Sequence, residues 1–519
     1  MRTPTDAKRW TNLAASLLII LAGGTVYAFG AYSEALKRKL HLTQAQLELA
    51  ALCGNLGNYL GTAGFFYDRY GAVASAKFGA TLIGLGYGLQ WLLCVYFESG
   101  DHAIEFLCVF CFVWGHGSGY LDCAAIGSGV RAFPRRRGAV VGLLKSFYGL
   151  ASSLIILGAA PWLSGVNFIV ALAVFAGGLP LLALCKFEDV ADRAPESDSI
   201  DNVAAGVLSS LSMRVVAFAL VALFIAVLRV VRPPSALGFN VAFTLVIAVG
   251  LAWIVRAAAR GHKREDGLFE NREDEDEEED EPTPTTPEHD SRPCATLGSP
   301  SYWLLLLAIL PGTGMGLMTI NNLGQIISAR GGQASTQRAA TAVVSVANGL
   351  GRLGCGALAD RIVQRGRPRA VLLVAADLMG ALAMFLFFVS GTSVPMALIA
   401  AAVSGAAYGA IWTLIPTLAA DLFGRKHFGA NYALILPAVS LAAVLFSTLL
   451  APAIYARHAD DDGCAGAACF GTTFLATAAA CGGGAVMALL LGVRSRKRYA
   501  IAEPPESLLA AARAGETVV

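Results

Sequence analysis

The chain has 519 residues, of which 56% are hydrophobic and only 15% are charged, and its formal net charge is +2. Because soluble domains carry about 25% charged residues, this composition excludes an ordinary soluble enzyme, and the near-zero net charge gives no electrostatic reason to expect nucleic-acid binding. The sequence therefore predicts an all-α polytopic protein whose apolar segments cross a bilayer.

The first part of the chain contains six predicted membrane spans. A bilayer core of about 30 Å requires roughly 20 apolar residues in a helix. The first charge-free window is followed by the charged residues Glu34 and Lys37 to Lys39 rather than by a small-residue cleavage site, so we predict a retained helix and no signal peptide. The windows of this part, the last of them a hairpin that breaks at Pro161, are Thr11–Ser33, Leu49–Tyr67, Phe78–Phe97, Phe106–Val130 and Ser146–Cys185.

The middle of the chain combines two additional spans with a strongly polar segment. Val207–Val231 and Pro233–Val255 are long enough to form an extra pair of helices. Residues 261–300 then include nine consecutive acidic residues, 273–281. Such a run cannot bury enough apolar surface to order itself, so we predict a disordered acidic cytoplasmic loop. A site for calcium or for a basic cytosolic partner is the alternative to a solvated tether.

The last part of the chain repeats the six-span pattern. Its windows, including a hairpin that breaks between Ser390 and Pro395, are Ser301–Ala329, Ala339–Ala359, Leu378–Ala420, Phe428–Ala456 and Gly463–Val493. We therefore predict about fourteen transmembrane helices. The predicted division is a six-helix half (1–190), an extra helix pair (191–260), the acidic loop (261–300), a second six-helix half (301–498) and a cytoplasmic tail (499–519).

Positive charges gather in the turns on one side of the predicted bundle. Turns on the cytoplasmic side of a membrane carry an excess of Lys and Arg, so we place both termini in the cytoplasm, with the cluster 37–39 as the exception. The membrane is the plasma membrane or that of an internal organelle. The positive turns are 131–137, 361–369, 425–426 and 494–498.

The chain also repeats a short motif. Gly64-Phe-Phe-Tyr-Asp68-Arg69 and Gly356-Ala-Leu-Ala-Asp360-Arg361 both read G-x-x-x-D-R, and each ends the second helix of its half. A second echo relates Phe133-Pro-Arg-Arg-Arg-Gly138 to Phe423-Gly-Arg-Lys426. These echoes indicate two halves of parallel topology.

The repeated motif resembles the signature loop of the major facilitator superfamily. The first 190 residues further resemble the nodulin-like family, which implies two six-helix halves and secondary transport by alternating access. Where that family favours Asn, this chain has Asp122. The resemblance to the nodulin-like family rests on Trp10, Tyr27-Ala-Phe-Gly-Ala-Tyr-Ser33, Leu36-Lys37, Tyr87-Gly-Leu-Gln-Trp91 and Phe133 to Lys145, and extends to Cys464–Cys469 in the last loop.

The carboxylates of the repeated motif need partners. Asp68 and Asp360 sit at helix C-termini, where a negative charge opposes the helix dipole. We expect them to contact nearby arginines, such as Arg69 and Arg361, or the N-terminus of a helix in the other half. A contact of that kind can lock one conformation and release it in another, so we predict gating turns. The alternative is a tight turn with a surface ion pair of little energetic value.

Four charged residues lie inside predicted spans, where they are costly and therefore candidates for function. Asp122, Lys145, Arg352 and Asp377 fall at one depth, about 10–14 Å from the cytoplasmic ends of their helices. We expect Lys145 and Arg352, one from each half, to face a central cavity and attract an anion. Asp122 would pair with Lys145 and carry a proton, and Asp377 would pair with Arg352 or cap a neighbour. The alternative is two structural ion pairs.

The remaining candidates are weaker. His116 is expected to be a hydrogen-bonded packing residue or a titrating group, and further cavity walls are predicted from Tyr27, Asn321, Tyr408 and Trp412. Glycine-rich segments such as 312–316 follow no strand and lie in apolar spans, so no cofactor site is predicted. We also predict no catalytic or metal residues.

The last outside loop contains two cysteines at short spacing. Cys464 and Cys469 favour a local disulfide in an oxidising compartment. A metal site that also uses the aspartates 460–462 is the alternative.

These patterns favour a secondary transporter of a small solute, with a proton-coupled organic anion as the preferred cargo. A metal or metal-chelate exporter is an alternative within the same class. A transporter-like sensor, which signals through the acidic loop, is an alternative from another class. The predicted partners are a small solute and the lipid bilayer, with no nucleic acid and no enzymatic activity.

Overall fold

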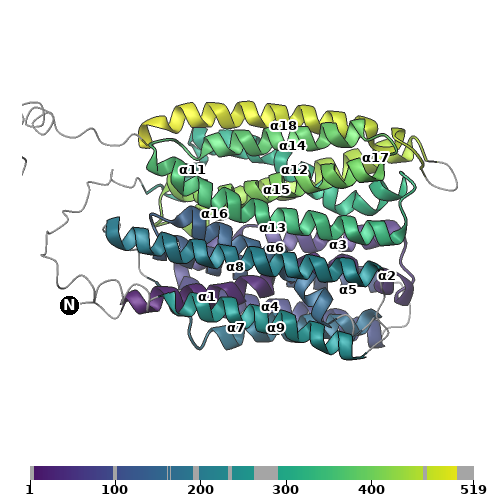
Figure 1. The fold of residues 1–519 in the computed structure, drawn as a ribbon, viewed down its shortest axis with the longest axis horizontal. Helices are drawn as coiled ribbons and strands as arrows, with labels where there is room; N and C mark the ends of the chain where they lie inside the picture. Colours follow the sequence, from purple (N-terminus) through teal and green to yellow (C-terminus); the bar gives the residue numbers. More distant parts are fainter. Residues whose placement is uncertain are drawn as a thin grey trace, which may run out of the picture.

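The computed structural model describes residues 5–96, 102–159, 162–163, 165–190, 198–231, 237–261, 290–459 and 464–499, and these residues are helical with no β-strand. The long helices run side by side along the longest axis of the molecule (Figure 1), with the N-terminal helices gathered on one side and the C-terminal helices on the other. This is the all-α polytopic architecture that the hydropathy predicts.

The N-terminal half contains the purple to blue helices of Figure 1. Gly71 has a non-helical backbone with φ of +85°, so α4 consists of two spans joined by a sharp turn. The second span therefore comprises α3 and the start of α4. The elements of this half are α1 (Thr5–Gly23), η1 (Gly24–Ala28), α2 (Phe29–Lys39), α3 (Gln44–Tyr59), α4 (Thr62–Tyr96), α5 (Ala103–Ala132), α6 (Arg137–Ala159), η2 (Gly165–Asn167) and α7 (Phe168–Ala183).

The rest of the chain adds two helices and a second half. The extra pair is α8 (Asp198–Val231) and α9 (Leu237–Ala259). The C-terminal half contains α11 (Pro293–Leu297), α12 (Pro300–Ser328), α13 (Ala334–Gln364), α14 (Ala370–Val389), α15 (Val394–Phe423), α16 (Phe428–Ala442), the π-helical η3 (Ala443–Leu450), α17 (Ala451–Ala456), α18 (Ala468–Ser495) and η4 (Arg496–Arg498).

Thirteen helices of the described part of the chain are long and apolar enough to cross a membrane. The sequence predicts about fourteen, and the difference is the second span, which consists of the 16-residue α3 and the part of α4 before the turn at Gly71. Both predicted hairpins are present, since α6 and α7 are separate helices, as are α14 and α15.

The structure differs from the predicted disordered loop 261–300 at the C-terminal end of that loop. The acidic run 273–281 lies outside the described residues. Residues 290–299 are ordered against the second half, because the Ser291 amide donates to the Phe423 carbonyl at 2.8 Å and the Thr296 hydroxyl donates to Asn431 at 2.8 Å. The short helix α11 follows, so the second half begins earlier than its first apolar residue indicates.

The two ends of the bundle differ in chemistry. One end, which we call the basic end, carries Gly71 and the turns 133–136, 365–369 and 424–427. The opposite end, which we call the disulfide end, carries the bond between Cys464 and Cys469. The halves pack on each other through α6 against α13 and through α4 against α16. The extra helix α8 packs on α6 and α13, and α9 packs on α1 and α6.

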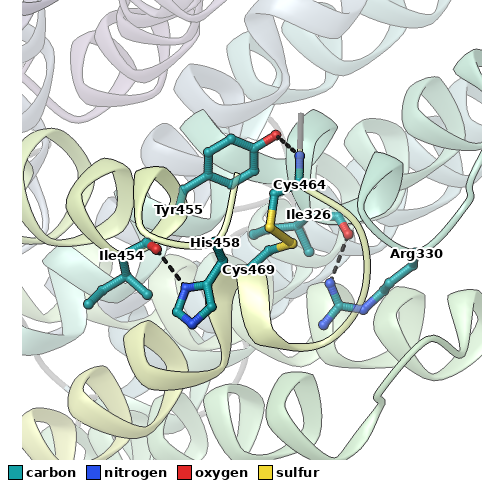
Figure 2. The surroundings of a disulfide bond; sticks show 7 residues. All are labelled: Ile326, Arg330, Ile454, Tyr455, His458, Cys464 and Cys469. Atoms are coloured by element: carbon teal, nitrogen blue, oxygen red, sulfur yellow. Dashed lines mark hydrogen bonds between the residues drawn. A yellow bond between two sulfur atoms is a disulfide. The ribbon is translucent and has the colours of Figure 1, made fainter. Parts of the chain in front are cut away.

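Figure 2 shows how the disulfide loop is held at its end of the bundle. The Cys464 amide donates to the Tyr455 hydroxyl at 3.2 Å, and the Gly466 amide donates to the carbonyl of Ala329 at 2.7 Å. Beside it, the Arg330 guanidinium donates to the carbonyl of Ile326 at 2.8 Å, and burial lowers the pKa of Arg330 to about 10. The aspartates of the alternative metal site, 460–462, lie outside the described residues.

Candidate functional site

Two matched contacts join the halves at the basic end. Asp68, at the end of the second span, accepts hydrogen bonds from the amides of Gly429 and Ala430 at 3.0 and 2.8 Å, at the start of α16. Asp360, at the equivalent place in the other half, accepts from the amides of Gly138 and Ala139 at 2.9 and 2.8 Å, at the start of α6. Each carboxylate therefore satisfies unpaired donors and the positive dipole end of a helix in the opposite half.

The glycine of each motif makes these contacts geometrically feasible. A Cβ on Gly64 would overlap the carbonyl oxygen of Gly429, and a Cβ on Gly356 would overlap the carbonyl oxygen of Gly138. Both glycines lie one helical turn before the aspartate of the motif. The close backbone approach of the two helices at the glycine is what brings the aspartate over the first amides of the partner helix.

Buried arginines support these carboxylates. Arg369 donates to Asp360 at 2.8 Å and to Asp421 at 2.6 Å. Burial acts to lower the pKa of Arg369, but the carboxylates of Asp421 and Asp360 raise it above its ordinary value. Arg137, at the start of α6, lies 3.5 Å from Asp421, which adds a further contact between the halves.

The arginines of the motif itself are not the main partners. The guanidinium of Arg69 lies 5.5 Å from the centre of the Tyr70 ring, and Arg361 is exposed. Arg131 instead lies 3.6 Å from Asp68. The expected contact with a helix N-terminus of the other half is thus present twice, and the arginines beside the carboxylates are Arg131 and Arg369 rather than Arg69 and Arg361.

A small cavity lies between the halves, deeper in the bundle. Its volume is about 10 Å³, close to the space of one water molecule. The N-terminal half contributes residues of η1, α3, α5 and α6, and the C-terminal half contributes residues of α13, α15 and α16. The lining residues are Tyr27, Asn58, Tyr59, Gly119, Asp122, Lys145, Tyr148, Arg352, Trp412 and Leu436.

Lys145 is the centre of a hydrogen-bonded group that crosses the cavity. Its Nζ donates to both oxygens of Asp122 at 2.7 and 2.8 Å and to the hydroxyl of Tyr432 at 3.1 Å. The Tyr432 hydroxyl in turn donates to Asp122 at 2.9 Å. The ammonium also lies 4.8 Å from the centre of the Trp412 ring, within the range of a cation–π interaction. The expected pair of Asp122 and Lys145 is present, and Tyr432 connects it to the other half.

Arg352 is the second cation of the cavity, and no carboxylate faces it among its hydrogen-bond partners. Its Nε donates to the Asn348 side chain at 2.8 Å, and its Nη1 donates to the backbone carbonyl of Lys145. The side chain is fully buried, and its Nη2 has no hydrogen-bond partner among the described residues. A buried guanidinium with a free donor is expensive to maintain, so this nitrogen is the natural point of attachment for an anion.

The structure also identifies cavity residues that the sequence analysis missed. Tyr148 accepts a hydrogen bond from Asn58 at 3.0 Å and lies 2.9 Å from the Ser118 hydroxyl. Of these residues, Asn58 and Tyr148 line the cavity, while Ser118 and Tyr432 hydrogen-bond to the lining residues Tyr148 and Asp122. The available signal was an uncharged polar side chain in an apolar span, which usually faces the bundle interior. Of the predicted walls, Tyr27 and Trp412 line the cavity, and Tyr408 packs behind Trp412 with ring centres 6.1 Å apart.

Asp377 does not join this cavity, and the expectation that it pairs with Arg352 or caps a neighbour is wrong. It lies on α14 against Gly312 of α12 and Gly484 of α18. Its side chain is fully buried, and neither oxygen has a hydrogen-bond partner within the described part of the chain. Depth along a helix does not specify which face of the helix the side chain occupies, so the sequence could not tell that Asp377 faces α12 and α18.

An Asp377→Asn variant is expected to melt at the wild-type temperature or a few degrees above it. Burial without a donor disfavours the charged form of the carboxyl, and the amide is a neutral group of nearly the same volume. The check is thermal unfolding of the purified protein in detergent at pH 7. A fall of several degrees would show that the carboxylate has a stabilising partner.

The two other polar candidates are structural. His116 lies 3.0 Å from the Gly57 carbonyl through Nδ1 and 3.1 Å from the Thr62 hydroxyl through Nε2, as expected of a packing residue. Asn321 donates to the Ser447 hydroxyl at 2.9 Å and so ties α12 to η3.

Two family models match the two parts of the chain. Residues 9–255 match the family described as Nodulin-like, and residues 296–501 match the family described as NFD4, C-terminal domain. Protein NUCLEAR FUSION DEFECTIVE 4 of Arabidopsis thaliana is 25% identical, with 95% of this chain and 90% of that protein covered. Probable transporter MCH1 of Wickerhamomyces anomalus is 23% identical, with 86% and 80% covered.

Solved structures of the major facilitator superfamily share the fold. The proton:xylose symporter XylE, bound to 6-bromo-6-deoxy-D-glucose, superposes with a TM-score of 0.56 at 16% identity. The superposition covers 98% of this chain and all of that one. The superposition extends over both halves, so the chain has the complete fold of that structure.

Proposed function

Because the chain is a nodulin-like protein of the major facilitator superfamily, and therefore a multi-pass secondary transporter rather than an enzyme, we propose that it carries a small organic anion with a single negative charge. The cargo would bind in the cavity between the halves and reach either side as the halves rock about it.

The observation that carries this proposal is the charge balance of the cavity. Asp122 offsets Lys145, since the ammonium contacts both carboxylate oxygens. Arg352 has no carboxylate among its partners and retains a free Nη2. One uncompensated positive charge in a water-poor cavity favours an anion of charge −1, and a guanidinium suits a carboxylate or phosphate group in particular.

Asp122 would couple this binding to protons. A proton on Asp122 removes the negative charge that neutralises Lys145, and the freed ammonium then adds a second cation for the cargo. An anion and a proton would therefore enter the cavity together, and their release on the other side would restore the ion pair. Linkage of this kind is reciprocal, so bound anion would also raise the affinity of the site for the proton.

The basic end would be the cytoplasmic gate. The positive turns favour a cytoplasmic position for this end, and hence for both termini. The Asp68 and Asp360 contacts would keep the basic end closed while the cargo enters or leaves the cavity at the disulfide end. An oxidising compartment on that side suits the bond between Cys464 and Cys469.

A thermal-shift screen of the purified protein would test the cargo. Binding raises stability by mass action, so small monocarboxylates are expected to raise the melting temperature, while sugars and neutral amides leave it unchanged. An Arg352→Gln variant is expected to lose at least 100-fold in anion affinity, and an Arg367→Gln variant, which alters an exposed arginine of the basic end, is expected to bind as the wild type does. Full anion binding by Arg352→Gln would refute the assignment.

The alternatives receive less support. No three His, Cys, Asp or Glu side chains of the described residues lie close enough together to hold a metal ion, so no observation favours a metal exporter. A transporter-like sensor would bind the anion without moving it. Anion uptake into vesicles that contain the purified protein separates the two functions.

A further inference from the structure

The extra helices α8 and α9 form a groove on the outside of the bundle. They approach each other closely where the Phe218 ring lies beside Gly250, and the groove lies between this contact and the basic end. The groove between them has a volume of about 640 Å³. Its walls are one stripe of each helix, with residues three or four positions apart. These residues are Val207, Ser210, Leu211 and Arg214 of α8 and Val249, Ala252, Trp253, Arg256, Ala257 and Arg260 at the end of α9.

Three arginines line this groove without an acidic partner. Arg256 and Arg260 are exposed and Arg214 is partly buried, and none of them forms an ion pair with a described residue. The nearest carboxylate on α8 that is described, Asp201, is taken by Arg136 at 2.9 and 2.5 Å. Arg214 lies 4.7 Å from the centre of the Trp253 ring. Charged side chains at a lipid-facing position are expensive and are retained for a partner.

The groove has the polarity of a phospholipid along its length. Arg260 follows the last turn of α9, Arg256 lies one turn deeper, and Arg214 lies beside Trp253 about one turn further in, so the positive charges line the groove from the basic end inward. Toward the middle of the bundle the wall becomes apolar, and Val249 is 65% exposed at its lip. Tryptophan is typical of the boundary between headgroups and acyl chains.

We propose that the groove between α8 and α9 binds an anionic phospholipid from the basic-end leaflet. Arg214, Arg256 and Arg260 hold the phosphate and the anionic headgroup, and the acyl chains leave over Trp253 and Val249. Basic pockets between membrane helices suit such headgroups, because the cytoplasmic leaflet is rich in anionic lipid.

The position of the groove gives the lipid a role in the architecture. α8 packs on α13 of the C-terminal half and on α6, while α9 packs on α1 and α6 of the N-terminal half. A headgroup held by both helices therefore connects a helix that packs on both halves to one that packs on the N-terminal half. The bound lipid then stabilises the packing of the extra pair beside the halves that move during transport.

Native mass spectrometry of the full chain in neutral detergent, with added phosphatidylglycerol or phosphatidylcholine, tests this proposal. Wild-type protein is expected to retain phosphatidylglycerol at least tenfold more strongly than phosphatidylcholine. The triple variant Arg214→Gln/Arg256→Gln/Arg260→Gln is expected to lose this preference. The matched control, Arg365→Gln/Arg367→Gln/Lys497→Gln, removes three exposed positive charges of the same end outside the groove and is expected to keep it. Thermal unfolding without lipid verifies that both variants are folded.

Three outcomes would overturn the assignment. The triple variant would retain the preference for phosphatidylglycerol, or the wild type would bind both lipids equally. In the third outcome, the acidic segment 273–281 of the same chain, and not a lipid, occupies the groove. In that case phosphatidylglycerol would bind only after the nine carboxylates of the segment are replaced by amides.

Discussion

An Asp360→Asn variant is expected to populate the conformation that is open at the basic end about 10- to 100-fold more than the wild type does. The carboxylate accepts two amide hydrogen bonds from the start of α6 and one from Arg369. Asparagine keeps one acceptor oxygen and loses the charge. Hydrogen bonds to charged groups contribute about 1.5–3 kcal/mol, and each 1.4 kcal/mol is a factor of ten. The loss of the two amide hydrogen bonds acts on the closed state alone, because α6 separates from α13 when this end opens, whereas Arg369 lies in the same half as Asp360.

The measurement is the distance between spin labels on Lys77 and Arg367, which are exposed residues of the two halves, in a chain whose nine free cysteines are replaced. Pulsed electron paramagnetic resonance would show a longer distance in Asp360→Asn. Asp189 provides a matched control, since its carboxylate accepts from the amides of Ala72 and Val73 at 2.5 and 3.1 Å within one half. Asp189→Asn is expected to lower stability and leave the distance unchanged. If the two variants give identical distances, then Asp360 only caps α6 and does not control the opening of the basic end.

The fold was predictable because each of its features has a local signal in the sequence. Apolar windows give the spans, and the G-x-x-x-D-R repeat gives the pairing of the halves. The turn at Gly71 divides α4 in the way that the separate windows Leu49–Tyr67 and Phe78–Phe97 require. The ordering of residues 290–299 was not predictable, because it depends on contacts of Ser291 and Thr296 with residues more than 130 positions away.

The candidate site was predictable in composition but only partly in arrangement. Depth along each helix gives the layer that contains Asp122, Lys145 and Arg352, and the three do line one cavity. Rotation about the helix axis is not fixed by depth, so Asp377 was placed in the same group, although it faces α12 and α18. Tyr432 was missed because a tyrosine in an apolar helix carries no sign of its partner until the halves are assembled.

An Asp122→Asn variant is expected to bind the anionic cargo at least tenfold more tightly at alkaline pH and to lose the pH dependence of binding. In the wild type, the carboxylate competes with the cargo for Lys145, because it already accepts both hydrogen bonds at 2.7 and 2.8 Å. The amide cannot neutralise the ammonium, so the cavity carries two uncompensated cations at every pH. The same change is expected to abolish accumulation of the anion against its gradient when a pH difference drives uptake, because no proton accompanies the cargo.

This result needs to be separated from a loss of folding, since removing one partner of a buried ion pair typically costs about 3–5 kcal/mol. An Asp122→Asn/Lys145→Met variant removes both charges, and we expect it to recover much of the stability without the tighter binding. Asp377→Asn, which alters a buried carboxyl outside the cavity, is expected to leave binding and its pH dependence as in the wild type. Isothermal titration at pH 6 and pH 8 measures the affinities, and uptake into vesicles measures the coupling. If Asp122→Asn still accumulates the anion in response to a pH difference, then another group carries the proton. Arg352 would in that case still explain why the cavity selects an anion, but Asp122 would have no part in the coupling.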